Sequence, residues 1–225
     1  MISSSKIAFL FLVISNCTFT ESFHPLTTRS SVARLRCVEK SGPEWTPDSL
    51  DLVISKADHV SQGVVLLAQP SEYNHFLIKA AVFVYDFGTG RGSKGVILER
   101  ATAFSMGETS PNSGPFGLNT LYLGGEDGSD RAIMFHKYDL GEKSKYIGAG
   151  IYTGGLTQAA VLVEESSASP KDFKFIFNSV EWGPGQLEAE VQAGRWDVAN
   201  IPSNLILQQS SSAASLWSKA RNTLR

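Results

Sequence analysis

Two tryptophans, Trp182 and Trp196, bracket the segment that most restricts how this chain can fold. Pro184 presets the first turn of a helix, and Gly194 is a residue that readily ends one. The sequence therefore predicts a short helix over residues 186–193, between the two indole rings. Because an indole ring hides a large apolar area when it is buried, we expect both rings to pack this helix against a sheet.

The predicted helix carries its apolar and polar side chains on different faces. Leu187 and Val191 are four residues apart and form the pair that we expect to be buried. Gln186 and Glu190 share another face, whereas Glu188 and Glu190 lie about 200° apart around the helix and cannot act as an acid and base pair. Structural packing is therefore the favoured role of this segment, and a ligand site near Gln186 and Glu190 is the alternative.

Short apolar runs between turns rich in glycine and proline predict several β-strands. The strands cover residues 63–68, 80–85, 95–98, 119–123, 132–136, 146–152 and 173–177. Residues 104–118 are rich in Gly, Pro, Ser and Asn, and this composition predicts a long exposed loop. No linker divides the region, so we expect a single domain over residues 61–225.

Apolar residues spaced by three and four predict further helices. One begins near Thr46, a suitable N-cap, in an extension that covers residues 38–60. Two others cover residues 157–164 and 213–224. The apolar stripe of the first helix consists of Leu50, Val53, Ile54 and Ala57.

Paired glycines at Gly124 and Gly125 mark a place where the backbone can adopt positive φ or approach another segment closely. Arg131 follows, and its guanidinium can contact a carboxylate or a phosphate through two donors. The alternative, which we favour, is a tight turn in which Arg131 pairs with Glu126 or Asp127.

The first 37 residues have the composition of a targeting leader. Residues 1–22 combine a lysine with an apolar run too short to span a membrane, as a signal peptide does. Residues 23–37 carry three arginines and no acid, which is typical of a transit peptide. This arrangement, with Phe23 after the signal peptide, resembles the bipartite plastid leaders of heterokont algae. We therefore predict import into the plastid stroma, with plain secretion as the alternative.

The composition of the remaining chain argues against several partners. The net charge is −2, and residues 1–36 carry four positive side chains and one negative, so that −5 remains beyond them. An acidic body argues against nucleic acid, whose phosphates need clustered Lys and Arg. Cys17 and Cys37 lie in the leader or at its edge, and the histidines lack metal-ligand spacing, so we predict no metal and no cofactor. No apolar run beyond the signal peptide is long enough to span a membrane.

Four blocks in this order resemble the AlgH/YqgE family over roughly residues 60 to 221. They are residues 63–70 followed by Phe76; residues 95–100; residues 121–125 with Asp130-Arg131 and Phe135-His136; and Trp182 with Gly185-Gln-Leu-Glu-Ala-Glu190 and Trp196. The resemblance implies an α+β domain with a twisted, mostly antiparallel sheet or partial β-barrel flanked by helices. The fourth block is very specific.

The chain departs from the family pattern at two places. It has Glu99-Arg100-Ala101 where the family usually has Asn, then Arg or Lys, then Pro, and it has Glu126 where Gly-Gly is usually followed by Pro. Members have been labelled transcriptional regulators, but the sequence has no helix-turn-helix with a basic second helix. The resemblance therefore implies a fold and little about activity.

A non-enzymatic binding or regulatory domain is the leading hypothesis, because no nucleophile with an identifiable base is present. It would bind a small anion, a metabolite or a protein through residues of the third and fourth blocks: Gly124, Gly125, Arg131, His136, Gln186 and Glu190. The first alternative is a hydrolase or transferase with His136 as general base near Glu188 or Glu190. The second is a transcriptional regulator.

Overall fold

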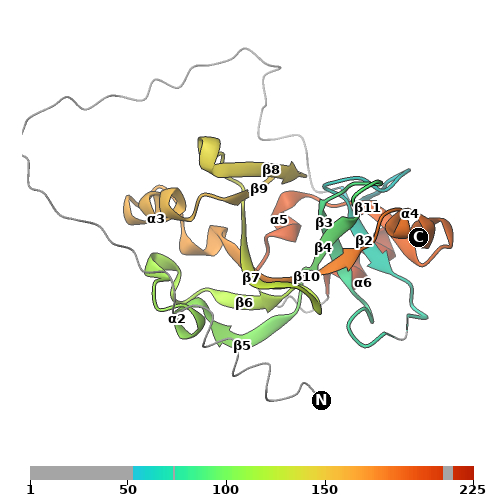
Figure 1. Cartoon of the computed structure of the whole chain (residues 1–225), viewed down its shortest axis with the longest axis horizontal. Coiled ribbons are helices and arrows are strands. Elements are labelled where there is room, and N and C mark those ends of the chain that lie inside the picture. Colours follow the sequence, from blue (N-terminus) through green and yellow to red (C-terminus); the bar gives the residue numbers. More distant parts are fainter. Residues whose placement is uncertain (1–52, 73, 210–214) are drawn as a thin grey trace, which may run out of the picture. The chain divides into compact units, whose positions relative to one another are not determined.

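The computed structural model describes residues 53–72, 74–209 and 215–225 (Figure 1). The predicted leader and the start of the first predicted helix lie outside these residues. The strands are β1 (Ser55–Lys56), β2 (Val65–Ala68), β3 (Ala81–Asp86), β4 (Ser93–Ile97), β5 (Ala101–Ser105), β6 (Thr120–Leu123), β7 (Asp127–His136), β8 (Ser144–Gly148), β9 (Ile151–Gly154), β10 (Lys174–Trp182) and β11 (Trp196–Asn200). The helices are α2 (Met106–Thr109), α3 (Leu156–Glu164), α4 (Gln186–Gln192), α5 (Ser203–Ile206) and α6 (Leu216–Thr223), with short 3₁₀ turns η2 (Gly114–Phe116), η3 (Gly141–Lys143) and η4 (Pro170–Asp172).

The described strands form one sheet in the order β1-β11-β2-β3-β4-β10-β7-β9-β8. Strand β6 also pairs with β10, and β5 pairs with β6, so the sheet branches at β10. Every pairing is antiparallel except that of β6 with β10. The expected α+β domain with a mostly antiparallel sheet is confirmed, and the strands do not close into a barrel.

Strand β10 belongs to two halves of this sheet. Its first residues pair with β6 and β7, and its last residues, Val180 to Trp182, pair with β4. Between them Asn178 has a φ of 64°, and the register to β7 shifts. Such a bulge bends a strand. Strands β1, β11, β2, β3 and β4 therefore form a first half, and β5, β6, β7, β9 and β8 form a second half.

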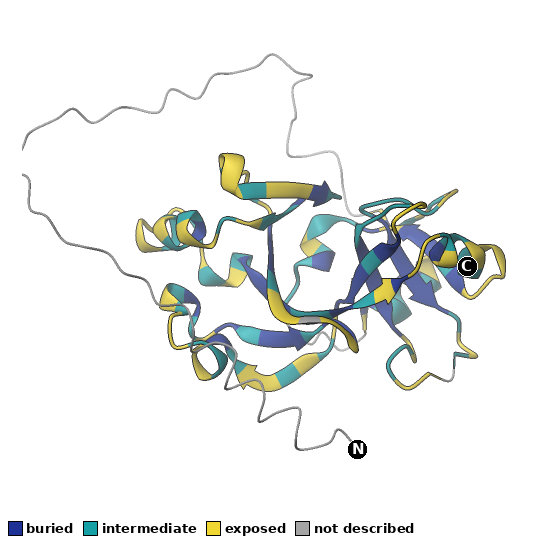
Figure 2. Cartoon of the chain, viewed as in Figure 1, coloured by how far each residue is buried: buried dark blue, intermediate teal, exposed yellow. Residues whose placement is uncertain are grey.

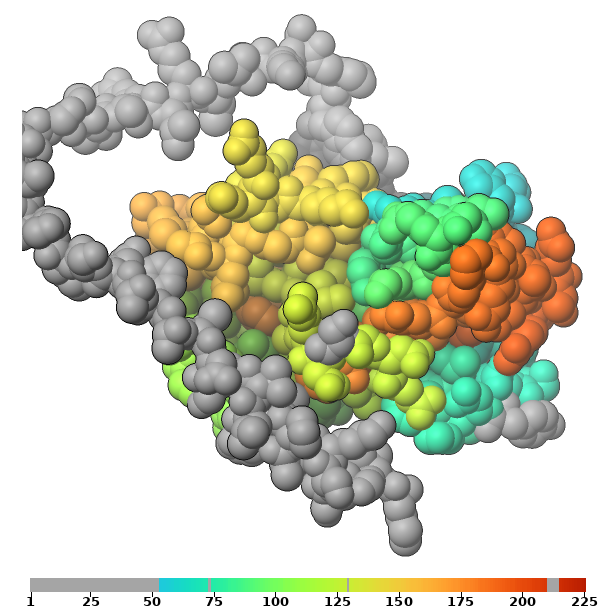
Figure 3. Space-filling view, viewed as in Figure 1, coloured from blue at the N-terminus to red at the C-terminus, as the bar shows by residue number. Residues whose placement is uncertain are grey.

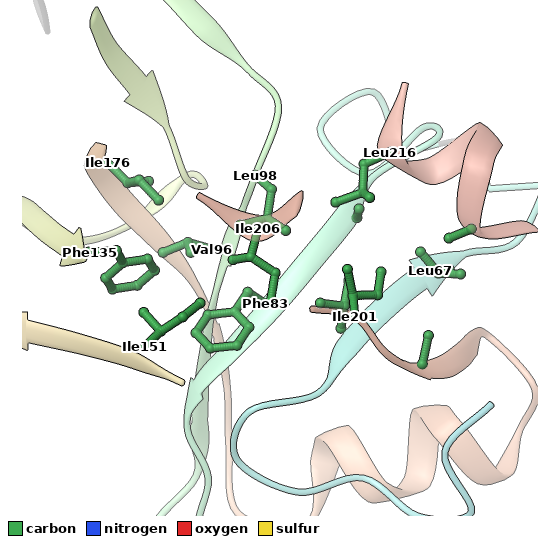
Figure 4. Close-up of a cluster of buried hydrophobic side chains, with 14 of the residues drawn as sticks. Leu67, Phe83, Val96, Leu98, Phe135, Ile151, Ile176, Ile201, Ile206 and Leu216 are labelled. Atoms are coloured by element: carbon green, nitrogen blue, oxygen red, sulfur yellow. The ribbon is translucent and has the colours of Figure 1, made fainter. Parts of the chain in front are cut away.

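The largest apolar cluster contains residues of both halves. Figure 4 shows Phe83 of β3 beside Phe135 of β7, and Ile151 of β9 next to them. The ring centroids of Phe83 and Phe135 are 5.7 Å apart. Ile206 of α5 and Leu216 of α6 complete the cluster from the C-terminal region. Burial of each such side chain contributes about 2 kcal/mol, so this cluster contributes strongly to stability.

The first half of the sheet is buried on both faces. In β2, Leu67 belongs to the central cluster, whereas its neighbour Leu66 belongs to a second cluster that contains Trp182. The outer face of the second half carries a third cluster around Phe116 and Phe173, with residues from α2, η2 and α3. Figure 2 shows the buried residues concentrated in the strands. Burial on both faces explains why the strands have continuous apolar runs.

The prediction of a helix that begins near Thr46 is wrong for the residues of that segment that the structure describes. Ser55 and Lys56 form β1, which pairs with β11. Ile54 is buried, but Val53, expected on the same apolar face, is 73% exposed. The edge of β11 offers backbone hydrogen bonds to this segment, and this tertiary pairing outweighs the helical spacing of the apolar residues.

The long exposed loop predicted over residues 104–118 is also wrong. Helix α2 begins after Ser105, whose side chain forms a capping box with Glu108. Met106 and Phe116 are buried, with 8% and 1% of their surface exposed. These two apolar side chains anchor the segment to the third cluster, despite its content of Gly, Pro and Ser.

Most other elements lie where the sequence places them, including α3, α4, α6 and strands β2, β3, β4, β6 and β10. The single strand predicted over residues 146–152 is instead the hairpin β8–β9. Its turn contains Ala149 and Gly150, both with positive φ. Strands β5 and β11 and helix α5 were not predicted. Within the described ranges, no helix has the length and apolar character needed to cross a membrane.

Candidate functional site

Glu190 of α4 joins the two tryptophans of the fourth block. Its Oε2 accepts hydrogen bonds from Trp182 Nε1 at 3.1 Å and from Trp196 Nε1 at 2.8 Å. Its Oε1 accepts from Gln186 Nε2 at 3.1 Å and from Arg195 Nη1 at 3.4 Å. The Glu190 side chain is only 15% exposed, so these four donors replace most of its contact with water. Hydrogen bonds to a carboxylate are stronger than those between neutral groups, so the block is firmly held.

The helix that carries Glu190 is packed tightly onto the first half of the sheet. Gly185 precedes it with a φ of 71°, and Leu187 is fully buried beneath it. The rings of Trp182 and Trp196 meet edge to face with centroids 6.2 Å apart, and each is about 5% exposed or less. Figure 3 shows the segment around α4 at the surface, next to the connection between β3 and β4. These contacts give the fourth block a role in packing.

The paired glycines of the third block allow a close approach between β6 and β10. A Cβ atom on Gly124 would lie 2.4 Å from the carbonyl oxygen of Asn178. A Cβ atom on Gly125 would lie 2.0 Å from the carbonyl oxygen of Ser179. Both distances are below 3.0 Å, the limit that real Cβ atoms keep. The residues that follow β6 therefore have to be glycine for the sheet to branch at this place.

Arg131 lies on β7 with its side chain exposed. The pairing with Glu126 or Asp127 that the sequence favours is not formed, because no ion pair within 4.0 Å joins Arg131 to a described residue. Its guanidinium is therefore open to solvent. Asp130, the residue before it, has a φ of 52°.

His136, at the end of β7, lies inside the protein. It is fully buried, and its Nε2 is 3.0 Å from the carbonyl oxygen of Gly154. The imidazole stacks on the Tyr152 ring and also meets the ring of Phe173. Burial lowers the pKa of His136 below its ordinary value, and the backbone hydrogen bonds partly offset this effect. A neutral imidazole that donates to Gly154 accounts for the geometry.

The structure divides the six predicted binding residues between two places. Four of them lie on β7 or directly after β6, in the second half of the sheet, and two lie on α4 against the first half. The hydrogen-bond and ring partners of His136 and the partners of Glu190 have no residue in common. His136 therefore makes no hydrogen bond to Glu188 or Glu190.

Comparison with known proteins accounts for the joint presence of the four blocks. The AlgH-like family model matches residues 65–225, which is more than half of the chain. The chain belongs to the AlgH-like family. A UPF0301 protein of Pelodictyon phaeoclathratiforme is 26% identical over 156 residues, covering 68% of this chain and 82% of the relative. A UPF0301 protein of Chlorobium limicola is 26% identical over 172 residues, covering 75% of this chain and 89% of the relative.

Solved structures of similar proteins have the same fold as this AlgH-like domain. The AlgH protein of Pseudomonas aeruginosa aligns with a TM-score of 0.52 and 16% identity, over 72% of this chain and 84% of that protein. A protein of Corynebacterium diphtheriae aligns with a TM-score of 0.54 and 18% identity, over 72% of this chain and 93% of that protein. At such identities the likeness concerns the fold alone. The family is one of uncharacterised function, so activity has to be argued from this chain's own residues.

Glu99, the first departure of this AlgH-like domain from the family pattern, caps helix α6. Its Oε1 accepts a hydrogen bond from the Leu216 N–H at 2.6 Å, and its Oε2 accepts one from the Trp217 N–H at 3.3 Å. A carboxylate at a helix N-terminus also interacts favourably with the helix dipole. Trp217 Nε1 in turn donates to the Ala68 carbonyl oxygen at 2.8 Å. The departure therefore fastens the C-terminal helix to the sheet.

A buried lysine is a polar feature that the sequence pattern does not predict. Lys174 at the start of β10 is 1% exposed, and its Nζ donates to the carbonyl oxygens of Ile206 and Gln208, both at 3.0 Å. The same ammonium group lies 4.6 Å from the centre of the Tyr122 ring. Burial lowers the pKa of Lys174 to about 7, although the negative charge of Glu99 raises it. Lys174 thus connects β10 with the segment that leads to α6.

Lys174 is expected to make the free energy of unfolding rise between pH 7 and pH 9, by at most about 1.4 kcal/mol per pH unit. In that range the unfolded chain binds a proton at Lys174, whose ordinary pKa is 10.5, and the folded chain does not. Lys174→Met should flatten this rise. Urea unfolding of the full chain, followed by circular dichroism at pH 7, 8 and 9, measures the slope. An equal slope in the variant would show that Lys174 keeps its ordinary pKa.

Proposed function

We propose that this AlgH-like domain is a non-enzymatic binding protein that works in the plastid stroma. The proposal rests on the hydrogen bonds that Glu190 and His136 make within the protein. Glu190 binds the two indole N–H groups, and His136 binds a backbone carbonyl inside the core. The two side chains that could transfer protons, His136 and Glu190, therefore stabilise the fold. The Arg131 side chain, in contrast, is exposed to solvent.

The surroundings of His136 give no support to a hydrolase or transferase that uses it as a general base. Such a base must lie within hydrogen-bond reach of the group that it deprotonates, in a concave site that admits substrate. His136 is 0% exposed, and its Nε2 already bonds to Gly154. The net charge of −5 beyond residue 36 likewise favours a partner other than DNA.

Arg131 is the side chain through which we propose that the domain contacts a small anion. Thermal unfolding of the full chain should show a saturable rise in Tm with citrate or sulfate, because a ligand of the folded state stabilises it. Arg131→Ala should remove that rise. Lys145→Ala, which deletes an exposed cation of β8, is the matched control and should retain it. Equal rises in Tm in the two variants would contradict the proposal that the anion binds at Arg131.

The plastid location is supported by the leader sequence and has its own test. Residues 1–37, fused to a fluorescent protein and expressed in a diatom, should direct the fusion into the plastid. Phe23→Ala should keep the fusion out of the plastid, whereas the neighbouring change His24→Ala should leave import intact. Secretion of the unmodified fusion would favour the alternative location.

A further inference from the structure

A small cleft lies where helix α6 meets the edge of the first half of the sheet. Its volume is about 100 Å³, which is room for a group the size of a phosphate rather than for a whole nucleotide. The lining residues come from β1, β11 and the C-terminal region: Lys56, Asp197, Arg221, Leu224 and Arg225. None of them is among the six binding residues predicted from the sequence, which include Arg131, so this cleft is a separate site.

Arg221 is held rigidly at this cleft. Its guanidinium donates to the Ala68 carbonyl oxygen at 3.0 Å and to Gln69 Oε1 at 3.1 Å, and it pairs with Asp197 at 2.9 Å. It also lies 5.5 Å from the centre of the Trp217 ring. The Arg221 side chain is 15% exposed, so part of the charge remains accessible. A cation fixed in this way loses little conformational entropy when an anion binds.

The other two cations of the cleft remain exposed to solvent. Lys56 and Arg225 are both exposed, and neither forms an ion pair with a described residue. With Arg221 they give three positive side chains against the single carboxylate of Asp197, so the lining side chains sum to two positive charges. The chain beyond residue 36 carries −5, so this cleft is a local positive site on an acidic protein.

We propose that the cleft binds a phosphate dianion, either inorganic phosphate or the phosphate group of a small monoester. The lining side chains are positive overall, which favours an anion over a neutral group. The fork of a guanidinium and the point charge of an ammonium are the two side-chain types that bind phosphate in proteins. A monoester would place its phosphate in the cleft and leave its organic part outside, since the volume admits little more.

Calorimetric titration of the full chain at pH 8, where phosphate is mainly the dianion, tests the proposal. Inorganic phosphate and glycerol 3-phosphate are titrated separately, so that tighter binding of the second identifies a phosphorylated metabolite. The double variant Lys56→Ala, Arg225→Ala should weaken binding roughly tenfold or more, because it removes two of the three cations that line the cleft. Both side chains are exposed, so the fold should persist, and circular dichroism verifies this.

The Arg131→Ala variant separates this proposal from the proposed function. Phosphate binding that is lost in the double variant and kept in Arg131→Ala supports the cleft. Binding that is lost in Arg131→Ala and kept in the double variant overturns the cleft proposal and leaves the Arg131 surface as the site. Absence of phosphate binding in the unmodified protein overturns the cleft proposal, while the citrate and sulfate tests of Arg131 remain decisive for the proposed function.

Discussion

Replacing Glu190 with Ala should lower the free energy of unfolding of the full chain by about 3 kcal/mol. The change removes the acceptor of Trp182 Nε1 and Trp196 Nε1, and both indole rings are almost fully buried. Two donors are thereby left without partners away from water, and this is more costly than the loss of an exposed ion pair. Urea unfolding followed by circular dichroism gives the midpoint and the slope from which the difference is calculated.

Two further variants separate the hydrogen bonds from other effects of the change. Glu190→Gln retains an acceptor oxygen, so its loss should be clearly smaller than that of Glu190→Ala. Glu188 lies on the same helix and has one buried oxygen without a hydrogen-bond partner among the described residues. Glu188→Ala removes an oxygen that makes no hydrogen bond, so it should not lower the stability. Equal losses at positions 188 and 190 would refute the role of Glu190.

Replacing Gly125 with Ala should have an even larger effect and prevent stable folding, with a loss above about 4 kcal/mol. The new Cβ atom would lie 2.0 Å from the Ser179 carbonyl oxygen and 2.6 Å from the Val180 nitrogen. Both atoms are backbone of β10, so no rotation of a side chain can relieve the overlap. Because β10 belongs to both halves of the sheet, the displacement would disturb the central cluster. The amount of soluble protein and its circular dichroism spectrum measure the result.

Gly183→Ala is the matched control for this prediction. At Gly183 the nearest atom to a new Cβ would be Gln186 Oε1 at 3.7 Å, an ordinary contact, and the residue does not need positive φ. This variant should fold with nearly unchanged stability. A Gly125→Ala protein as stable as the control would mean that β6 and β10 do not approach each other as closely as the structure has them.

The sequence predicts the central strands well because their signal does not depend on distant partners. Strands β2, β3 and β4 are buried on both faces, so each has a continuous apolar run bounded by turns. Helix α4 has a proline near its start and a glycine after its end, which are local signals as well. Elements of this kind can be located from local sequence patterns alone.

The elements that were missed depend on contacts between residues far apart in sequence. Strand β1 exists because the edge of β11 pairs with Ser55 and Lys56. The segment 104–118 packs on the sheet because Phe116 contacts the rings of Phe173 and Phe175. No spacing rule within either segment predicts these partners.

In the candidate site, too, local contacts can be predicted from the sequence and contacts between distant residues cannot. The sequence places Gln186 and Glu190 on one face of a helix, and in the structure they are joined by a hydrogen bond. It does not predict that Glu190 also accepts from both indoles, since this depends on where β10 and β11 begin and end beside α4. Lys174 was missed for a related reason. A lysine in a strand of alternating apolar residues suggests an exposed face, but the end of α5 and the residues directly after it cover that face.

Hydrogen exchange of the indole N–H groups, measured by NMR on the full chain, tests most directly whether the fourth block is a packed, internally bonded unit. Assignment uses single Trp→Phe variants of Trp182 and Trp196. Both N–H groups should exchange far more slowly than a free indole, and both resonances should shift in Glu190→Gln. Exchange at the rate of free indole, with no shift in that variant, would place the two rings in water and contradict the account of the fold and of Glu190.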